Sequence, residues 1–407
     1  MSGRELDAWI LDVVRTPRGA GRPNGALHGV RPIELVAGLL DALRRRCPGV
    51  AEAAQDFILG CVTQTGEQGG NLARIAALYA GYSAQISGLT VNRFCASGLS
   101  ACALAAQALH AQGLSVVVAG GVESMSRVPM MSDGGPWYAD PQVARRTRFV
   151  HMGIAADLIA TLEGFERAAL DAYAIRTHAR AARARDEGRF ARSMIPVTDA
   201  GGSVLAARDE LVRHPLDTAK LSALEPAFAA IGASGADAIA LEGRTDVSRI
   251  EHRHTVATSP AMADGAALVL LASRDGAQRL AQAPRARIVA TAEAADDPVL
   301  MLTAGQLAAQ RALAAAGLEP RDLDVVEFNE SFAAVTLKFE RDLDLDPERL
   351  NPNGGSIAFG HAMGSTGAAL LGMALDELER RDGEHALIAI SGGAGVGAAM
   401  LIRRERS

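Results

Sequence analysis

Two stretches of this chain that lie far apart follow the same order of residue types. Cys95–Gly121 and His361–Gly393 each begin with a reactive side chain, continue through a helix rich in Gly, Ala and Ser, and end in a Val/Ile strand with paired glycines. Such self-similarity indicates an internal repeat of one supersecondary unit. We therefore expect a duplicated α/β half, in which the loops that carry Cys95 and His361 are equivalent and meet at a pseudo-dyad.

Apolar strands and helical segments alternate along both parts of the chain. The near-continuous apolar character of the strands is typical of a parallel or mostly parallel sheet that helices cover on both faces. In the first half we expect strands at 8–14, 56–62, 89–92 and 114–119, and helices at 32–46, 70–80 and 96–110. In the second half we expect strands at 286–290, 323–328 and 386–390, and helices at 305–316 and 364–380.

The segment between the halves has a different composition, with Met, Arg, Trp and Tyr, a helical stretch at 166–186 and a Gly/Ala-rich stretch at 222–244. Long insertions on α/β scaffolds commonly bind substrate. We therefore expect three units. They are an N-terminal half formed by 1–121 with 252–273, an inserted loop or cap domain at 122–251, and a C-terminal half at 274–407.

Composition excludes several classes of protein. The chain has 407 residues, of which 49% are hydrophobic, and its formal net charge of −6 argues against nucleic acid or an anionic membrane as the main partner. The four cysteines, Cys47, Cys61, Cys95 and Cys102, form no CxxC pair and no metal-ligand pattern. With no signal peptide and no 18-residue apolar run, we expect a soluble protein in the reducing cytoplasm.

Cys95 lies where a β-rich approach ends and a small-residue helix begins. A thiol at a helix N-terminus feels the positive end of the helix dipole and unpaired backbone N–H groups. Both favour the thiolate, which is the nucleophilic form of cysteine. The alternative is a buried structural cysteine, which is a common role for free cysteine. Three further motifs favour the nucleophile.

The second motif is the segment 351–364, which holds four glycines in fourteen residues and carries His361 just before a helix. Such a loop implies close backbone approach and positive φ angles. His361 could be a structural histidine in a turn. His361 takes the place of Cys95 in the repeat. This equivalence favours a nucleophile–base pair formed by Cys95 and His361 over a structural histidine.

The third motif places Asn329 and Glu330 after an apolar strand, at the end where α/β folds bind ligands. Asn329 could hold a water or donate to a carbonyl oxygen, or it could instead be a helix N-cap. The fourth motif, Ser391–Gly397, is a glycine-rich loop that can direct backbone N–H groups at an oxyanion. No helix-opening GxGxxG with a downstream acid follows it, so we do not expect a dinucleotide site.

Taken together, these motifs resemble the thiolase family of acyl-CoA C-acyltransferases. The resemblance implies a thiolase-like α/β fold of two similar halves with an inserted loop domain. It also implies that 3-oxoacyl-CoA is formed or cleaved through an acyl thioester on Cys95. The match covers essentially the whole chain, in the segments 11–19, 91–100, 120–126, 151–153, 264–267, 329–330 and 354–364.

The resemblance also implies roles for single residues. Cys95 would accept the acyl group, and His361 would activate Cys95 and help to hold the thioester oxygen of the second substrate. Asn329 would fix a water in that same oxyanion hole. The backbone N–H groups of Cys95 and Gly393 would form the other oxyanion hole, where the tetrahedral intermediate is stabilised.

Four residues, His151, Met152, Met301 and Phe332, fall where the family lines the pantetheine and acyl channel. We add Ser259 to this substrate-binding set, next to Pro260 where the family often has a serine that contacts CoA. The implied partners are acyl-CoA and CoA as substrates, with no permanently bound cofactor and no metal. The stretch between 125 and 151 is shorter than the corresponding loop of those family members in which this loop joins dimers into tetramers. We therefore expect a homodimer, with a tetramer possible.

The chain departs from the family pattern at Ser391. Thiolases carry a second cysteine about thirty residues after the histidine, and that thiol moves the α-proton, but no cysteine follows Cys102 here. A hydroxyl is a far weaker base than a thiolate, so C–C bond making should suffer while acyl loading need not. Three explanations stay open: an active-site variant, a divergent enzyme with another base, or a shift to acyl transfer or hydrolysis. A weakly active structural partner in a β-oxidation complex is the non-catalytic alternative.

Overall fold

The computed structural model describes residues 6–199 and 201–406, and most of its strands form one mixed sheet. The hydrogen-bonded order is β10-β11-β12-β9-β1-β8-β5-β3-β4, and β2 adds to β8. The strands are β1 (Trp9–Arg15), β2 (Gly19–Ala20), β3 (Asp56–Gly60), β4 (Leu89–Val91), β5 (Val116–Ser124), β8 (Ala263–Ala272), β9 (Ala286–Ala295), β10 (Val325–Phe328), β11 (His385–Gly392) and β12 (Val396–Arg404).

Parallel pairing is confined to β4, β3 and β5 in the first half and to β10 and β11 in the second. The remaining neighbours, among them β5 with β8 and β11 with β12, are antiparallel. The expectation of parallel pairing therefore holds for these five strands and not for the other pairs of the sheet. β8 is buried at every position and, apart from Asp264, contains only apolar residues and glycine although its pairing is antiparallel.

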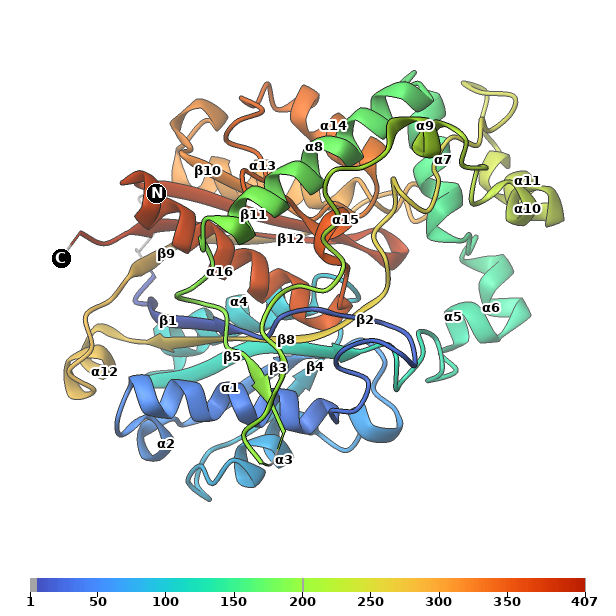
Figure 1. Ribbon diagram of the computed structural model, residues 1–407. Helices are drawn as coiled ribbons and strands as arrows, with labels where there is room; N and C mark the ends of the chain where they lie inside the picture. The colour runs from blue at the N-terminus through green and yellow to red at the C-terminus, as the bar shows by residue number, and fades with distance from the viewer. Residues whose placement is uncertain (1–5, 200, 407) are drawn as a thin grey trace.

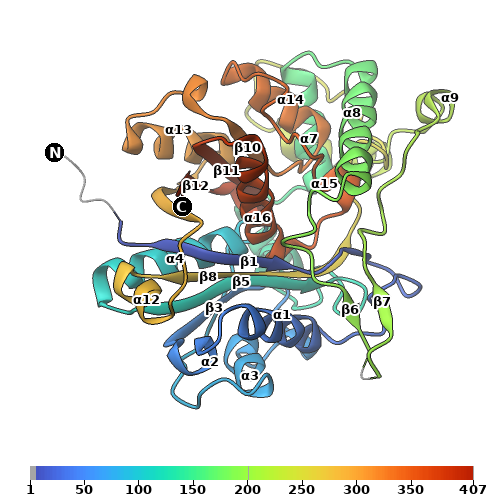
Figure 2. The same ribbon diagram turned by 60° about the vertical axis from the view of Figure 1, so that its left-hand side comes forward.

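The sheet divides into two parts at the pairing of β1 with β9, which is only two residue pairs long. Figures 1 and 2 show the two parts as separate layers, with α4 and α16 between them. Helices α1, α2 and α3 cover the outer face of the first part, and α13 and α14 cover that of the second. These helices are α1 (Pro32–Arg46), α2 (Val50–Ala53), α3 (Leu72–Tyr79), α4 (Ser97–Gln112), α13 (Ala304–Ala316), α14 (Ala333–Asp342) and α16 (Met363–Arg381).

The two central helices confirm the duplication. Helix α4 leads into β5 and α16 leads into β11, so each half repeats the same helix–strand unit. The helices approach so closely that a Cβ on Gly98 would lie 2.5 Å from the carbonyl oxygen of Gly364. Glycine is required at such a contact because any side chain would displace the facing backbone. The loops that precede these helices, which carry Cys95 and His361, are thereby held next to each other.

The window Phe94–Ala111, which contains most of α4, is long and apolar enough to cross a membrane by length and composition. In the structure 72% of this window is buried, because α4 lies between the two parts of the sheet. Its apolar character is therefore that of a core helix packed on both sides.

The segment between the halves carries short elements around two longer helices. Figure 1 shows α5 and α6 at the right-hand edge of the molecule and α9, α10 and α11 above them. The division into 1–121 with 252–273, 122–251 and 274–407 stays a prediction. The elements of this segment are α5 (Pro136–Ala139), α6 (Pro141–Arg146), α7 (Met152–Leu162), α8 (Arg167–Asp186), β6 (Val197–Thr198), β7 (Val204–Ala206), α9 (Thr218–Ser222), α10 (Ala229–Ile231) and α11 (Asp237–Leu241). Two short helices complete the second half, α12 (Arg274–Arg279) and α15 (Ser356–Phe359).

Candidate active site

Cys95 lies between β4 and α4, at the end of the first part of the sheet. The residue before it, Phe94, has a φ of +47°, an unusual value for a residue with a side chain, and this turn directs the chain into the helix. Cys95 is buried, and the backbone N–H groups of Cys95 and Gly393 both act to lower the pKa of its thiol. Two residues that are almost 300 positions apart thus lie beside one cavity.

The thiol of Cys95 is not activated in the free protein. Burial, together with the nearby charge of Glu123, raises its pKa to about 12, against the opposing effect of the two backbone N–H groups. Loss of solvation therefore outweighs the effect of the helix N-terminus in the free protein. At neutral pH the thiol keeps its proton, so the nucleophile must form by proton transfer during the reaction.

Glu123, at the end of β5, connects the loops of the two halves. Its buried carboxylate accepts hydrogen bonds from the backbone N–H groups of Val62 (3.0 Å), Thr63 (3.1 Å) and Gly364 (2.9 Å), and from Gln68 Nε2 (2.8 Å). Gly364 belongs to the first turn of α16, whereas the other donors follow β3. The segment 120–126 carries this residue, but its structural role could not be read from the sequence.

His361 lies between α15 and α16 with one ring nitrogen fixed and the other free. Nδ1 is 2.9 Å from Thr366 Oγ1, and that hydroxyl donates to the carbonyl oxygen of Ala362 at 3.1 Å. Since the hydroxyl has one hydrogen, Nδ1 is the donor to Thr366 and Nε2 carries the lone pair. Nε2 is buried and has no partner among the described residues.

The charge state of His361 suits a base. Burial, together with the positive charge of Arg18, lowers the pKa of His361 to about 3. The ring is therefore neutral at physiological pH, with an unpaired acceptor at Nε2. A cationic neighbour would also resist full protonation of the ring, so any proton accepted there is readily passed on.

A cavity of about 40 Å³ lies beside the nucleophile. Its walls include Cys95, Gly393 and Met152, and also Met363, which lies two residues after His361. The structure thus brings together three of the residues selected from the sequence and places the segment after His361 beside them. This grouping is what the duplicated halves lead one to expect.

Asn329 follows β10 in a fully buried position. Its Oδ1 accepts a hydrogen bond from Ser356 Oγ (2.7 Å) and its Nδ2 donates to Ser331 Oγ (3.1 Å). Helix α14 begins at Ala333, with Phe332 as the residue that precedes it, so Asn329 is not the N-cap of this helix. Because Ser356 opens α15, just before His361, the Asn329 amide is tied to the histidine loop.

Ser391, which the sequence pattern predicts to stand in the place of the second cysteine, lies near the end of β11, and its hydroxyl makes two hydrogen bonds. Oγ donates to the carbonyl oxygen of Leu302 at 2.7 Å and accepts from the backbone N–H of Gly305 at 2.9 Å. Ser391 is fully buried, and both partners lie at the start of α13. The hydroxyl therefore serves to hold this helix against the strand.

Two of the five substrate-binding residues selected from the sequence, His151 and Phe332, belong to a row of aromatic rings. The other three are Met152, Met301 and Ser259. His151 Nδ1 accepts from the N–H of Gly153 (3.0 Å), and its ring lies 5.4 Å from that of Phe228, which lies 5.7 Å from that of Phe332. Burial lowers the pKa of His151. Phe228 was not selected from the sequence, because it lies in a segment whose Gly/Ala-rich composition carries no motif.

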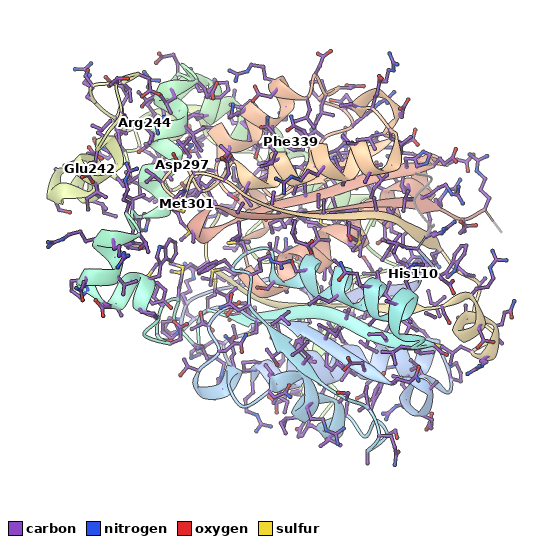
Figure 3. The ribbon with its side chains drawn as sticks, turned by 180° about the vertical axis from the view of Figure 1, so that it is seen from behind. His110, Glu242, Arg244, Asp297, Met301 and Phe339 are labelled. Carbon is purple, nitrogen blue, oxygen red and sulfur yellow. The ribbon has the colours of Figure 1, made fainter. Side chains whose placement is uncertain are left out.

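Met301 and Ser259 lie on other segments than this row. Met301 is buried with a φ of +34° in the loop between β9 and α13. Figure 3 shows it close to Asp297, whose Oδ2 is 4.0 Å from Nη1 of Arg244 in the inserted segment. Ser259 Oγ donates to the carbonyl oxygen of Thr255 at 2.8 Å, which leaves only its acceptor capacity for a ligand.

Comparison with known proteins identifies the family. A model of the thiolase N-terminal domain matches residues 8–240, and a model of the thiolase C-terminal domain matches residues 282–404. The chain belongs to the thiolase family. The two matches together span most of the chain.

Curated thiolases are similar to this one over nearly their full length. A beta-ketoadipyl-CoA thiolase of Escherichia coli is 37% identical over 420 residues, covering 98% of this chain and 99% of the relative. A 3-ketoacyl-CoA thiolase of Alcanivorax borkumensis is 36% identical over 413 residues, covering 99% of this chain and 100% of the relative. A beta-ketoadipyl-CoA thiolase of Acinetobacter baylyi is 36% identical, covering 98% and 99%.

Membership of this family makes the chain a thiolase-type acyltransferase with acyl-CoA and CoA as its substrates. The described residues of this thiolase contain no group of three or more His, Cys, Asp or Glu side chains placed to hold a metal ion.

Proposed function

We propose that this thiolase transfers acyl groups through a thioester on Cys95 and that its C–C bond chemistry is reduced. The observation that carries the proposal is that Cys95 and Gly393 line the same small cavity, where their backbone N–H groups both act to lower the pKa of the Cys95 thiol. Two preorganised donors at one sulfur are suited to stabilise the oxyanion that forms when this sulfur attacks a carbonyl carbon.

The acylation step follows from the protonation states. His361 Nε2 takes the proton of the Cys95 thiol as the sulfur attacks the carbonyl carbon of acyl-CoA. The tetrahedral intermediate carries its negative charge on the former carbonyl oxygen, near the N–H groups of Cys95 and Gly393. When the C–S bond to CoA breaks, His361 returns the proton to the leaving thiolate, and free CoA departs.

A second oxyanion position serves the thioester of the other substrate. A water fixed by Asn329 donates to that oxygen, since the Asn329 amide is buried and tied to the loop of His361 through Ser356. His361 Nε2 donates to the same oxygen only while it carries a proton taken from a thiol. Removal of one such donor typically lowers the rate by about 10²–10³. CoA and its pantetheine arm lie along the row of His151 and Phe332, with Met301 and Ser259 as further contacts.

The C–C step lacks a suited proton acceptor. Ser391 donates its only hydroxyl hydrogen to Leu302 and accepts from Gly305, so its oxygen is poorly placed to remove an α-proton. The acyl group on Cys95 is then passed mainly to a thiol such as CoA, or to water. The relatives' names point to 3-oxoacyl-CoA as the class of substrate from which the acyl group comes.

The test is covalent trapping. The protein is mixed with acetyl-CoA, denatured, and analysed by intact mass and peptide mapping. The wild type should gain one acetyl group on Cys95, and Cys95→Ala should gain none. Cys102→Ala is the matched control, since Cys102 is a buried cysteine on α4, the helix that follows Cys95. This variant should still be acetylated on Cys95. An acetyl adduct of the same amount in Cys95→Ala would contradict the proposal.

We also propose a homodimer formed along β4, the strand at one end of the sheet order. An unpaired edge strand is prone to pair with another chain. Three apolar side chains gather there, Leu89 (46% exposed) on β4 and Ile75 (48%) and Leu78 (42%) on α3. Ile75→Glu should shift the mass in light scattering from dimer to monomer. Val204→Glu on β7, at 61% exposure, should not.

A further inference from the structure

Trp137, on α5 in the inserted segment, closes one side of the cavity beside Cys95. Its ring centroid lies 5.2 Å from that of Phe94, the residue before the nucleophile, and 4.8 Å from that of Phe149. The same ring packs on Gly393, where a Cβ would lie 3.2 Å from Cη2 and from Cζ3. Trp137 thus contacts both loops that meet at the sulfur.

The cavity that remains is small and mainly apolar. Its volume is about 40 Å³, whereas a single water requires roughly 10–15 Å³ by the same kind of measure. The walls away from the sulfur are formed by Met130, Met152, Met363 and Trp137. This space suits a group of two or three carbon atoms, and a longer chain would have to displace the Trp137 ring.

Charge adds a second restriction. Among the described residues that line the cavity, Asp133 is the charged one, and its carboxylate accepts a hydrogen bond from Tyr138. No arginine, lysine or histidine lies on the described wall. An acyl chain ending in a carboxylate would therefore meet an anion without a compensating cation, which is costly in a partly desolvated site.

We propose that Trp137 is a specificity-determining residue that limits the acyl group on Cys95 to short, uncharged chains such as acetyl and propionyl. The proposal rests on the acyl-Cys95 function proposed above and adds the class of acyl group. Helix α5 lies at the edge of the molecule (Figure 1), and Trp137 is only partly buried. Its replacement should therefore enlarge the cavity without disturbing the core.

The first test measures acylation of Cys95 by a panel of thioesters. The rate of adduct formation is followed by intact mass with acetyl-CoA, hexanoyl-CoA and succinyl-CoA. The wild type should react with acetyl-CoA about 10–100-fold faster than with hexanoyl-CoA, as expected when extra carbon atoms overfill a packed site. Trp137→Ala should raise the ratio of the hexanoyl rate to the acetyl rate by at least about tenfold. The succinyl rate should stay low in both proteins.

The matched control is Tyr138→Phe, which keeps a ring beside Trp137 and loses only the hydroxyl that bonds to Asp133. This variant should exclude the hexanoyl group as the wild type does. Trp137→Leu provides a second, milder enlargement should the alanine variant fold poorly. Equal acetyl and hexanoyl rates in the wild type would overturn the proposal, as would a hexanoyl rate that neither Trp137 variant raises.

A second measurement separates this proposal from the catalytic one. Alkyl methanethiosulfonates convert a thiol to a mixed disulfide with release of a sulfinate, so they probe the space around Cys95 without acyl transfer. The methyl reagent should label Cys95 in the wild type much faster than the hexyl reagent, and Trp137→Ala should remove most of that difference. If the thiosulfonates show this size selection but no acyl adduct forms, the acyl-Cys95 function is contradicted and the role of Trp137 is not. Acyl loading without size selection contradicts the role of Trp137 alone.

Discussion

The hydroxyl of Ser391 donates a hydrogen bond of 2.7 Å to the carbonyl oxygen of Leu302. The hydroxyl oxygen of Ser391 also accepts a hydrogen bond from the backbone N–H of Gly305. Ser391, near the end of β11, therefore supports the first turn of α13. A thiol forms weaker and longer hydrogen bonds than a hydroxyl. Serine at this position therefore holds the start of α13 more firmly than a cysteine would.

Ser391→Cys should restore C–C chemistry and weaken the fold. A thiol in this place can supply the missing acid–base step, which is typically worth about 10²–10⁴ in rate. The free energy of unfolding should fall by about 1–3 kcal/mol, because the partners at Leu302 and Gly305 lose a good hydrogen bond. Thiolysis of acetoacetyl-CoA and urea denaturation measure the two effects. Ser391→Ala is the control, with the same loss of stability and no gain in thiolysis; an unchanged thiolysis rate in Ser391→Cys contradicts the assignment.

Cys95 should be slow to alkylate at neutral pH. Since the pKa of its thiol is raised to about 12, the thiolate fraction grows about tenfold for each pH unit between 7 and 10. The rate of Cys95 labelling by iodoacetamide, measured by peptide mapping in Cys102→Ala, should rise with a slope near one in a plot of log rate against pH. A rate that is already constant above pH 6 would mean that a Cys95–His361 ion pair exists in the resting protein.

Glu123→Gln should destabilise the protein by about 2–4 kcal/mol. Glu123 Oε1 accepts from Thr63, Gln68 and the Cys61 thiol, and Oε2 accepts from Val62 and Gly364. The amide nitrogen of glutamine would face at least two of these donors without accepting from them. Urea denaturation gives the free energy of unfolding. Glu67→Gln removes a carboxylate that is bound to Arg127 near the surface and should change stability by less than about 1 kcal/mol. Equal effects of the two substitutions would contradict the connecting role of Glu123.

His252 links α7 to α11 through two carboxylates. Its Nδ1 is 3.0 Å from Asp157 Oδ2 and its Nε2 is 3.1 Å from Asp237 Oδ2, in α11. Burial lowers the pKa of His252, but the bonds to Asp157 and Asp237 prevail, and the net pKa is raised. The stabilisation is therefore fully present below the unfolded pKa near 6.5 and is lost as pH rises through the folded pKa.

His252→Gln should accordingly lower Tm by about 1–3 °C near pH 6, and by less as pH rises toward 9. Differential scanning calorimetry across this range measures the difference. The matched control is His110→Gln, at an exposed histidine near the end of α4 (Figure 3), which should leave the pH profile of Tm unchanged. A His252 effect that grows with pH would contradict the charged bridge.

Local pattern was sufficient to predict much of the fold. Helix α1 spans Pro32–Arg46, the bounds that its apolar spacing and Pro32 indicate, and α16 and β11 fall within a few residues of their expected limits. The repeat predicted that the loops of Cys95 and His361 meet, and Gly98 against Gly364 is the contact that holds them. These features depend on residue types at fixed spacing, which a sequence displays directly.

Long-range relations could not be predicted in the same way. The buried ion pair of Arg15 with Asp209 joins residues 194 positions apart, and neither residue has a local pattern that names its partner. The raised pKa of Cys95 depends on burial and on Glu123, which only the packed structure brings near. Trp137 appears in the sequence as an aromatic residue of an irregular segment, and its place beside Gly393 follows from how that segment packs.

The central claim is that the nucleophilic half of the reaction is intact while the C–C step is impaired. The most direct measurement compares two rates in one preparation: acetylation of Cys95 by acetyl-CoA, and release of acetyl-CoA from acetoacetyl-CoA with free CoA. The account predicts rapid acetyl-Cys95 formation and cleavage that is slower by about 10² or more. Cleavage of acetoacetyl-CoA as fast as acetyl loading would contradict it, and would show that another group replaces the missing thiol.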